Sequence, residues 1–406
     1  MEDGIFEGLK VLDCASFIAA PAAATVLSDF GAQVIKIEPP GSGDPYRNLP
    51  NLPGYPHSEH NFAWLLEARN KRSLALDLSK PEGQAVLHRL AAEADVFITN
   101  FPPAVRGRLG IAYAELAPLN ERLIYASFTG YGEKGEEANK PGFDSNAYWA
   151  RSGLMDLVRA DTTTTPARSV AGMGDHPCAM ALYGAIVTAL YKRERTGKGS
   201  HVASNLMANG VWANGVMAQA KLCGAKFSER RPREHALNAV TNHYKCRDGR
   251  WIILSLLNEE KQWPALARCL GREDLISDAR FASKTDRHAR SLELIGLLTV
   301  SMLSPSNGTS TSLSIICRSV GISSRMPTTP NTRPLPSSRV RHSARSRVAK
   351  ISSNSLISSS ERAWRSGLVA NLGSVMKSSR PRQRASAGHC RSSLSSERMS
   401  QRPSRH

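Results

Sequence analysis

A sharp change in composition near residue 303 limits how much of this chain can build a folded core. Residues 301–406 contain 30 Ser, 18 Lys and Arg, and two Glu, but no Asp, Phe or Tyr. Such a segment buries too little apolar surface to offset the entropy of ordering it. We therefore expect residues 304–406 to be a Ser/Arg-rich tail, either disordered or the product of a frame-shifted reading.

The net charge of +18 follows the same division of the chain. Residues 301–406 carry +16, and residues 1–300 carry only +2. A basic nucleic-acid-binding protein is the alternative that this charge suggests, but such proteins place charge on a folded face with aromatic side chains for stacking. The basic segment has a single aromatic residue, Trp364. We therefore expect no specific nucleic-acid partner.

Cysteine usage and hydropathy bear on the compartment. The seven cysteines stand singly, with no Cys-x-x-Cys pair, so we expect reduced thiols and no zinc site. No stretch approaches the roughly 18 uninterrupted apolar residues of a membrane span. The N-terminus is acidic, unlike a signal peptide. These features predict a cytoplasmic protein with no membrane association.

Short apolar runs alternate with helical segments in the first 205 residues. This alternation predicts a parallel, Rossmann-like sheet with its ligand near the carboxyl ends of the strands. The expected strands are residues 10–13, 31–38, 73–77, 95–100, 123–128 and 201–204, and the expected helices are residues 21–30, 81–94 and 176–195. We assign residues 1–205 to this large α/β domain.

A second, smaller α+β unit is expected after residue 205. Residues 206–303 contain a helical segment, a polar linker, a hairpin and two further helices. These elements are expected at residues 207–222, 225–240, 244–255, 261–270 and 291–303. We assign residues 206–303 to the linker and to part of a small domain.

The turn after the first strand argues against a dinucleotide. Residues 15–21 contain no glycine, whereas the dinucleotide fingerprint needs three at that turn. No P-loop sequence occurs either. Basic residues near the expected strand ends nevertheless suit a phosphorylated ligand, because ammonium and guanidinium groups bind phosphate oxygens. These residues are Arg47, Lys71, Arg72, Arg106, Arg108 and Lys140.

Several of these segments together resemble the family III coenzyme A transferases, the superfamily of formyl-CoA transferase, carnitine CoA-transferase and the acyl-CoA racemases. The resemblance extends from about residue 5 to about residue 300, with the motifs in order. The motifs are LKVLD (9–13), LSDFGAQVIKIE (27–38), GSGD (41–44), NKRS (70–73), NFPP (100–103), RLG (108–110), GFD (142–144), GD (174–175) and RTGKG (195–199).

The resemblance implies both the assembly and the role of the C-terminus. Members of the family form interlocked homodimers, in which a C-terminal segment completes the small domain and returns to the large one. No such segment is recognisable after about residue 300. An inactive truncated relic is therefore an alternative to an active, dimeric transferase.

The resemblance also implies the reaction, transfer of CoA from an acyl-CoA thioester to a free carboxylic acid. The catalytic aspartate of the family falls on Asp175, which would pass through an acyl anhydride and an aspartyl-CoA thioester. In isolation Asp175 reads more readily as a helix N-cap, because it precedes an apolar helix with Pro177 in its first turn. No metal or permanently bound cofactor is implied, since CoA enters as substrate. The substrate-binding positions would be Phe17, Ile18, Ala19, Arg47, Lys71, Asn100, Phe101, Val105, Arg108 and Lys140.

The resemblance favours transfer over racemisation. The racemases of the family carry a histidine where this chain has Phe143, and a phenyl ring cannot accept a proton. His176 reads as a surface histidine, and Asp144 reads either as a residue that positions the site or as an exposed loop aspartate. We expect the amides of Gly172 and Gly174 to donate to a developing oxyanion. Residues 130–132 and 148–151 look most like members that act on 2-hydroxy or aryl acids, with dicarboxylates as the alternative.

Overall fold

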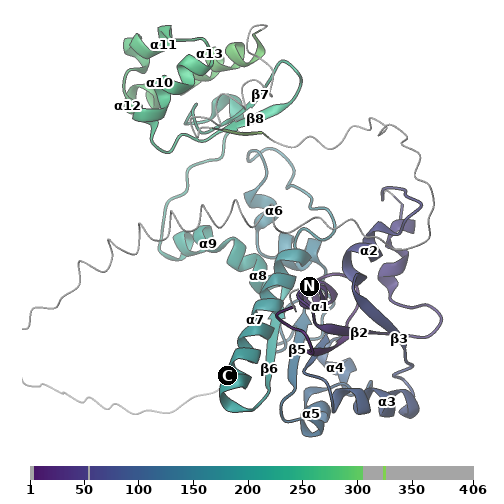
Figure 1. Ribbon diagram of the computed structural model, residues 1–406. Helices are drawn as coiled ribbons and strands as arrows, with labels where there is room; N and C mark the ends of the chain where they lie inside the picture. The colour runs from purple at the N-terminus through teal and green to yellow at the C-terminus, as the bar shows by residue number, and fades with distance from the viewer. Residues whose placement is uncertain (1–3, 54, 305–322, 326–406) are drawn as a thin grey trace, which may run out of the picture. The chain divides into compact units, whose positions relative to one another are not determined.

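The computed structural model describes residues 4–53, 55–304 and 323–325. Its first part is a six-stranded parallel sheet in the order β3-β2-β1-β4-β5-β6 (Figure 1). This order and the helices between the strands confirm the predicted Rossmann-like α/β fold. The strands are β1 (Lys10–Cys14), β2 (Gln33–Glu38), β3 (Lys71–Ala75), β4 (Val96–Thr99), β5 (Ile124–Thr129) and β6 (Ser200–Asn205).

The strand order places a crevice at the carboxyl end of the sheet. From β1 the chain adds β2 and β3 on one side, and β4, β5 and β6 then extend the other side. β1 and β4 are neighbours in register, with Cys14 opposite Thr99. The loops that follow these two strands therefore diverge, which is where ligands bind in open parallel sheets.

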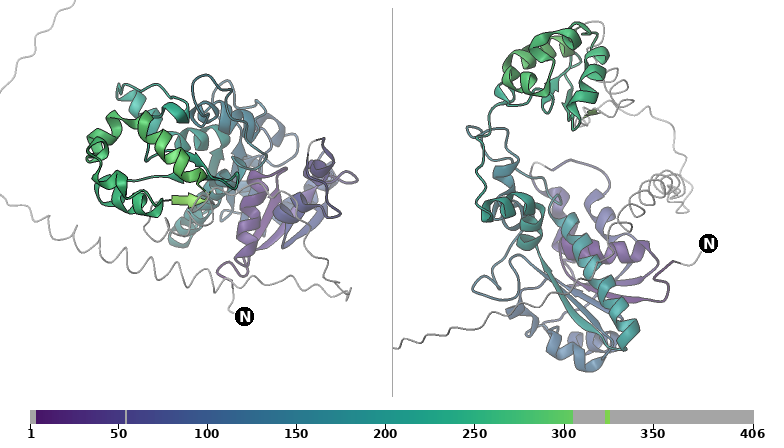
Figure 2. Two further views of the ribbon diagram at one scale, coloured as in Figure 1. Left: turned by 90° about the horizontal axis from the view of Figure 1, so that it is seen from above. Right: turned by 90° about the vertical axis from the view of Figure 1, so that its left-hand side faces the viewer.

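Helices cover both faces of the sheet, because the central strands are apolar on both sides. The long helix α7 (Asp175–Thr196) packs against α1 (Ala19–Asp29) on one face, and these are the teal and purple helices of Figure 2. The alternate side chains of the strands form a second core with α3 (Pro81–Ala91) and α5 (Tyr113–Leu116). This second core fills the opposite face.

Glycines end the two helices that matter most for the site. Gly31 follows α1, and its φ of 104° lets the chain turn from the helix toward β2. α7 ends at Gly197, whose φ of 70° is the left-handed conformation of a helix C-terminus. The shorter helical segments are η1 (Pro45–Asn51), α2 (Phe62–Ala68), α4 (Pro103–Arg106), η2 (Ala117–Leu119), a π-helical turn η3 (Asp144–Ala150), and α6 (Leu154–Leu157).

The helix expected over residues 207–222 is two helices. α8 (Leu206–Ala213) and α9 (Gly215–Leu222) are separated at Asn214, which has φ −87° and ψ 6°. The Asn214 amide donates to the Ser152 carbonyl oxygen at 2.8 Å. A side chain that bonds outside its own helix, followed by a glycine, explains the break.

The second part has its own apolar core and an antiparallel sheet. The predicted hairpin is β7 (His243–Lys245) and β8 (Trp251–Leu254), and β8 also pairs with β9 (Ser323–Arg325). The helices are η4 (Arg233–His235), α10 (Glu259–Cys269), α11 (Asp274–Ser277), η5 (Ala279–Phe281), α12 (Lys284–Ala289) and α13 (Ser291–Leu303). Of the expected tail, the structure describes only Ser304 and β9, and the domain boundaries at 205 and 303 stay predictions.

A buried arginine organises the core of this second part. Arg287 is fully buried and donates to the Phe281 carbonyl oxygen at 3.0 Å. Its guanidinium lies 5.5 Å from the centre of the Trp263 ring and 3.6 Å from a Glu259 carboxylate oxygen. The carbonyl oxygen, the carboxylate and the aromatic ring thus together stabilise the buried charge of Arg287.

Within the described residues, no helix is long and apolar enough to cross a membrane.

Candidate active site

The turn between β1 and α1 forms one wall of the site. Asn100, just after β4, holds this turn with two hydrogen bonds: the Ser16 N–H donates to its Oδ1 at 2.9 Å, and its Nδ2 donates to the Ser16 carbonyl at 2.7 Å. The next residue, Phe17, has φ 64°, which is rare for a bulky side chain. Its ring remains 38% exposed. A strained residue held open to solvent beside a crevice is typical of a binding site.

A chain of alternating buried charges lies beneath this turn. The Lys71 ammonium lies 2.9 Å from Asp13, and Lys36 lies 3.7 Å from the other Asp13 oxygen and 2.8 Å from Asp44. Burial lowers the pKa of Lys36, but Asp13 and Asp44 raise it by more. Asp44 also accepts the Phe17 N–H at 3.3 Å. We call Asp13, Lys36, Asp44 and Lys71 the charge network, and it anchors the strained turn.

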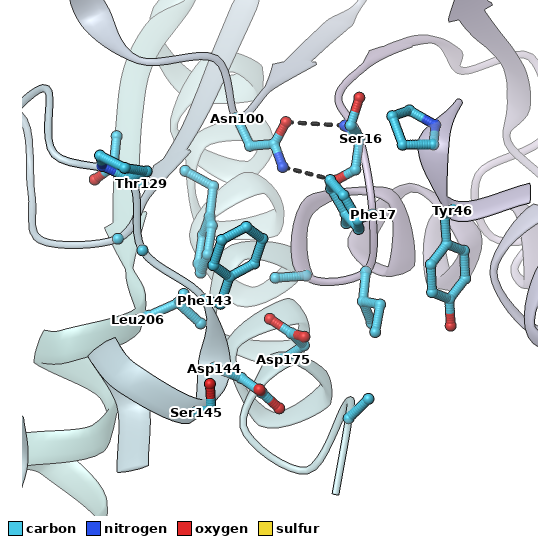
Figure 3. Close-up of a pocket in the computed structure, with 18 of the residues that line it drawn as sticks. Ser16, Phe17, Tyr46, Asn100, Thr129, Phe143, Asp144, Ser145, Asp175 and Leu206 are labelled. Atoms are coloured by element: carbon cyan, nitrogen blue, oxygen red, sulfur yellow. Dashed lines mark hydrogen bonds between the residues drawn. The ribbon is translucent and has the colours of Figure 1, made fainter. Parts of the chain in front are cut away.

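A cavity of about 590 Å³ opens at the carboxyl ends of β1, β4 and β5. Its wall combines the Phe17 turn with residues of η1, the loop after β4 and the loop before η3. Figure 3 shows the rings of Phe17 and Phe143 next to each other in its lining, with ring centres 5.8 Å apart and nearly perpendicular. The lining is mainly apolar, as small-molecule sites usually are.

Asp175 lies in this cavity as the first residue of α7 (Figure 3). Gly174 occupies the cap position and the helix lacks a side-chain cap bond, so the N-cap interpretation of Asp175 is wrong. Burial, followed by the charge of Asp144, raises the pKa of Asp175 to about 7, although His176 acts in the opposite direction. Asp175 is thus a carboxyl group that changes charge near neutral pH, a property common in active sites.

The side chain of Asp144 accepts hydrogen bonds from two backbone N–H groups that precede Asp175. One oxygen of its buried carboxylate accepts the N–H of Gly172 at 3.0 Å and of Gly174 at 3.4 Å. Both amides are therefore engaged in this structure, contrary to their expected use as oxyanion donors. Gly174 must be glycine, because a Cβ there would come within 2.7 Å of the Tyr148 ring. Asp144 consequently fixes the approach of the loop to α7.

Near Asp175, the sequence analysis missed Glu67 altogether and took His176 for a surface histidine. Glu67, from α2, is 3% exposed, and its Oε1 lies 2.7 Å from Nε2 of His176. His176 is half exposed but is held by this bond rather than being a plain surface histidine. The two residues are 109 positions apart in sequence. No local pattern connects them, and the packing of α2 against α1 and η1 brings Glu67 to the site.

The structure brings most of the predicted site residues to the cavity. Those that line it are Phe17, Ile18, Ala19, Asn100, Phe101, Lys140 and Asp175. Lys140 is the one cation among the described lining residues, and its ammonium lies 3.0 Å from Glu137. The predicted positions outside the described lining are Arg47, Lys71, Val105 and Arg108.

These remaining residues have other environments. Lys71 has a side chain 2% exposed and belongs to the charge network, so its ammonium is already satisfied. Arg47 binds the Glu38 carboxylate through two nitrogens at 2.7 Å and stacks over the Trp64 ring at 3.7 Å. Val105 is partly buried within α4, and Arg108 is exposed. Among the described residues there is no group of three or more His, Cys, Asp or Glu side chains arranged to hold a metal.

For the acyl-CoA substrate that the resemblance implies, we expect Asn100→Ala to raise KM about tenfold while changing kcat less. The substitution leaves both polar groups of Ser16 without their partner and loosens the strained Phe17 turn, at a cost of about 1–3 kcal/mol. Steady-state kinetics measures KM and kcat of the variant and the wild type. Asn120→Ala is the matched control, because the Asn120 amide donates to Ala94 just before β4, at the other end of that strand. Equal effects of the two substitutions would contradict a specific role for Asn100.

Comparison with known proteins agrees with this geometry. Residues 6–305 match the model of CoA-transferase family III. An (R)-2-hydroxy-4-methylpentanoate CoA-transferase of Clostridioides difficile is 38% identical over 68% of this chain and 69% of that protein. A cinnamoyl-CoA:phenyllactate CoA-transferase of Clostridium sporogenes is 35% identical over 68% of this chain and 67% of that protein.

A solved structure supports the same conclusion. A CAIB/BAIF family protein from Brucella suis aligns with a TM-score of 0.70 and 29% identity, over 80% of this chain and 85% of that one. The sheet order, the cavity at its carboxyl end and these matches agree. The chain is an enzyme of CoA-transferase family III.

Proposed function

We propose that this enzyme moves CoA from an acyl-CoA thioester to a free carboxylic acid through Asp175. One observation carries the proposal: the Asp175 carboxylate lies in the largely apolar cavity, at the start of a long helix and between motifs of the family. A carboxylate in such a place can act as a nucleophile toward a thioester carbonyl. The N-terminus of α7 stabilises its charged form.

The chemistry balances without a metal or an oxidant. An Asp175 oxygen bonds to the thioester carbonyl carbon, the carbon–sulfur bond breaks, and the electron pair leaves with the CoA thiolate. The thiolate then attacks the Asp175 carbonyl carbon of the mixed anhydride and releases the first acid as its carboxylate. The acceptor carboxylate repeats the sequence in reverse order. Each thioester is exchanged for another, so the overall transfer is nearly isoenergetic.

The lining of the cavity supports an apolar acyl group. Phe17, Phe143, Tyr46 and Leu206 line the same cavity as Asp175, and Lys140 alone supplies a cation among the described lining residues. A dicarboxylate would need a partner for its second charge. The relatives named for 2-hydroxy-4-methylpentanoate and for phenyllactate act on acids of this apolar kind. We propose a 2-hydroxy or aryl acid as the acceptor.

A racemase of the same fold is the alternative outcome. Phe143 is 53% exposed in the cavity and cannot exchange a proton. This residue favours transfer over racemisation. The interlocked homodimer and the cytoplasmic location stay predictions from the family and from composition.

The test is an exchange assay with the full chain in deuterated water. Phenyllactyl-CoA is mixed with isotopically labelled 2-hydroxy-4-methylpentanoate, and the CoA esters are followed by mass spectrometry. Label in the CoA ester supports transfer. Deuterium at the α-carbon without exchange would favour the racemase, and neither product would favour the inactive relic.

The pKa of Asp175 predicts how the rate depends on pH. Only the ionised carboxylate attacks, and half of it is protonated near pH 7. We expect kcat/KM for the acyl-CoA to rise about tenfold per pH unit below this value and to level off above it. Rates measured from pH 5 to pH 9 in buffers of constant ionic strength would show this. A flat profile from pH 5.5 to pH 7 would contradict the assignment.

A further inference from the structure

Beside Asp175, the structure contains an ion pair whose role neither the family match nor the proposed reaction assigns. Glu67 presents an almost fully buried carboxylate from α2, and His176 points its Nε2 at it from the first turn of α7, at 2.7 Å. A buried carboxylate that keeps its charge needs a partner with a positive charge. His176 is positioned to be that partner.

The other edge of the His176 ring lies close to the backbone of Gly172. A Cβ built on Gly172 would lie 3.0 Å from Cε1 and 3.2 Å from Nδ1 of the ring. The backbone N–H of His176 donates to the Gly172 carbonyl at 3.0 Å. Gly172 has φ 87°, which favours glycine. The imidazole is thus held between Glu67 and the loop that leads to Asp175.

The groups that face the ring come from three elements. Glu67 on α2 acts most strongly, first through the hydrogen bond, and Asp175 on α7 and Asp144 on η3 add their negative charges. Together these carboxylates raise the pKa of His176 above its ordinary value of 6.5. Lys71, the nearest cation of the charge network, interacts with Glu67 but is already bound to Asp13. The surrounding carboxylates therefore favour the protonated, positively charged form of His176.

This charge acts on the nucleophile. Burial, Asp144 and Glu67 all raise the pKa of Asp175, and His176 lowers it. A carboxylate that stays protonated does not attack a thioester. A cation one residue away, held by a buried anion, opposes the three influences that favour protonation.

We propose that the His176–Glu67 pair positions a positive charge that keeps Asp175 ionised for attack on the thioester. The proposal rests on the assignment of Asp175 as the nucleophile. His176 acts through Asp175 and does not touch the reacting atoms, so it is a positioning residue. Glu67 acts one step further away, by holding the imidazole and its proton.

The test compares pH profiles of kcat/KM for the full chain and its variants, with phenyllactyl-CoA as donor. His176→Gln keeps a donor for Glu67 but removes the charge. We expect its acidic limb to move up by about one pH unit, so that the rate falls about tenfold at pH 6. At pH 9 it should lie within about twofold of the wild type, because Asp175 is largely ionised there in both proteins.

Two further variants test whether the effect comes from the charge of His176 or from a structural role of its side chain. His176→Lys keeps a cation and should restore the acidic limb of the wild type. His288→Gln is the matched control, because His288 also pairs with a buried carboxylate, Glu259 at 2.9 Å, but does not line the cavity. It should leave the acidic limb in place. A uniform loss at all pH values in His176→Gln, without rescue by lysine, would overturn the proposal.

The state of the histidine can be followed directly. In protein with ¹³C-labelled histidine, NMR should show His176 titrating above 6.5 and at a lower pH in Glu67→Gln. An unchanged His176 titration in that variant would also overturn the proposal. Absence of exchange in the wild type would contradict the proposed function itself, whereas wild-type exchange with an unshifted His176→Gln profile would contradict only the role of the pair.

Discussion

Substituting Asp175 by Asn or Ala is expected to lower CoA exchange by at least about a thousandfold. Neither side chain can form the anhydride, so the covalent route is closed and only binding remains. The KM for the acyl-CoA should change little, because the cavity wall is intact. Exchange of labelled acid into CoA ester measures the effect. Ala is included because an Asn can deamidate back to Asp.

Chemical trapping tests the same carboxylate. Hydroxylamine added to the wild type with acyl-CoA should convert Asp175 into a hydroxamate, visible by mass spectrometry of its peptide. The Ala variant should show no such product. Exchange that survives in the Ala variant would remove Asp175 from its role.

The pH dependence of the free energy of unfolding shows whether the Asn variant of Asp175 keeps its native fold. The Asp175 carboxyl has an ordinary pKa of 3.8 and a pKa of about 7 in the folded protein. The folded state therefore holds the extra proton between these values, and stability falls as pH rises through that window. Asn, always neutral, should raise the free energy of unfolding at pH 8 by about 1–3 kcal/mol and leave it almost unchanged below pH 4. An Asn variant that is inactive and less stable at every pH would indicate a structural loss instead.

Lys36→Met is expected to lower the free energy of unfolding by about 3–5 kcal/mol. It removes the cation between Asp13 and Asp44, which are both buried, and leaves the Asp44 oxygen that faced it without its partner. A buried carboxylate without its cation is far more costly than the loss of one exposed pair. Urea unfolding followed by circular dichroism measures the change.

Lys10→Met is the matched control on the same sheet. Its ammonium also pairs with a carboxylate, Glu93 at 3.0 Å, but its side chain is 53% exposed. Exposed pairs contribute about 0–1 kcal/mol, so this variant should unfold close to the wild type. Similar losses in the two variants would contradict a special role for the charge network. Because Asp44 also accepts the Phe17 N–H, any folded Lys36→Met protein should bind acyl-CoA more weakly.

The arrangement of strands and helices could be predicted from local patterns. The central strands form apolar runs because both of their faces are buried, and Gly31 and Gly197 mark helix ends by their left-handed backbone. These signals lie within a few residues of the elements they define. The single expected helix over residues 207–222 was wrong because Asn214 bonds to Ser152, which lies 62 residues away.

Prediction of the basic site residues was less successful, for a physical reason. Sequence counts Lys71 and Arg47 as cations but does not show whether their charge is already paired. In the folded protein Lys71 binds Asp13, and Arg47 binds Glu38. Lys140, which looks no different in sequence, also pairs with a carboxylate, Glu137, but it lines the cavity. Pairing depends on which carboxylates the sheet brings close.

By itself, the sequence determined the fold class, the placement of Asp175 at the start of a helix, and the position of the Phe17 turn and Asn100 at the carboxyl end of the sheet. Each follows from hydrophobic periodicity or from motifs of the family. The tertiary structure alone decided the electrostatics around Asp175. Glu67, Asp144 and His176 come from different elements, and their effect on the carboxyl group depends on burial and separation, which exist only once the chain has folded.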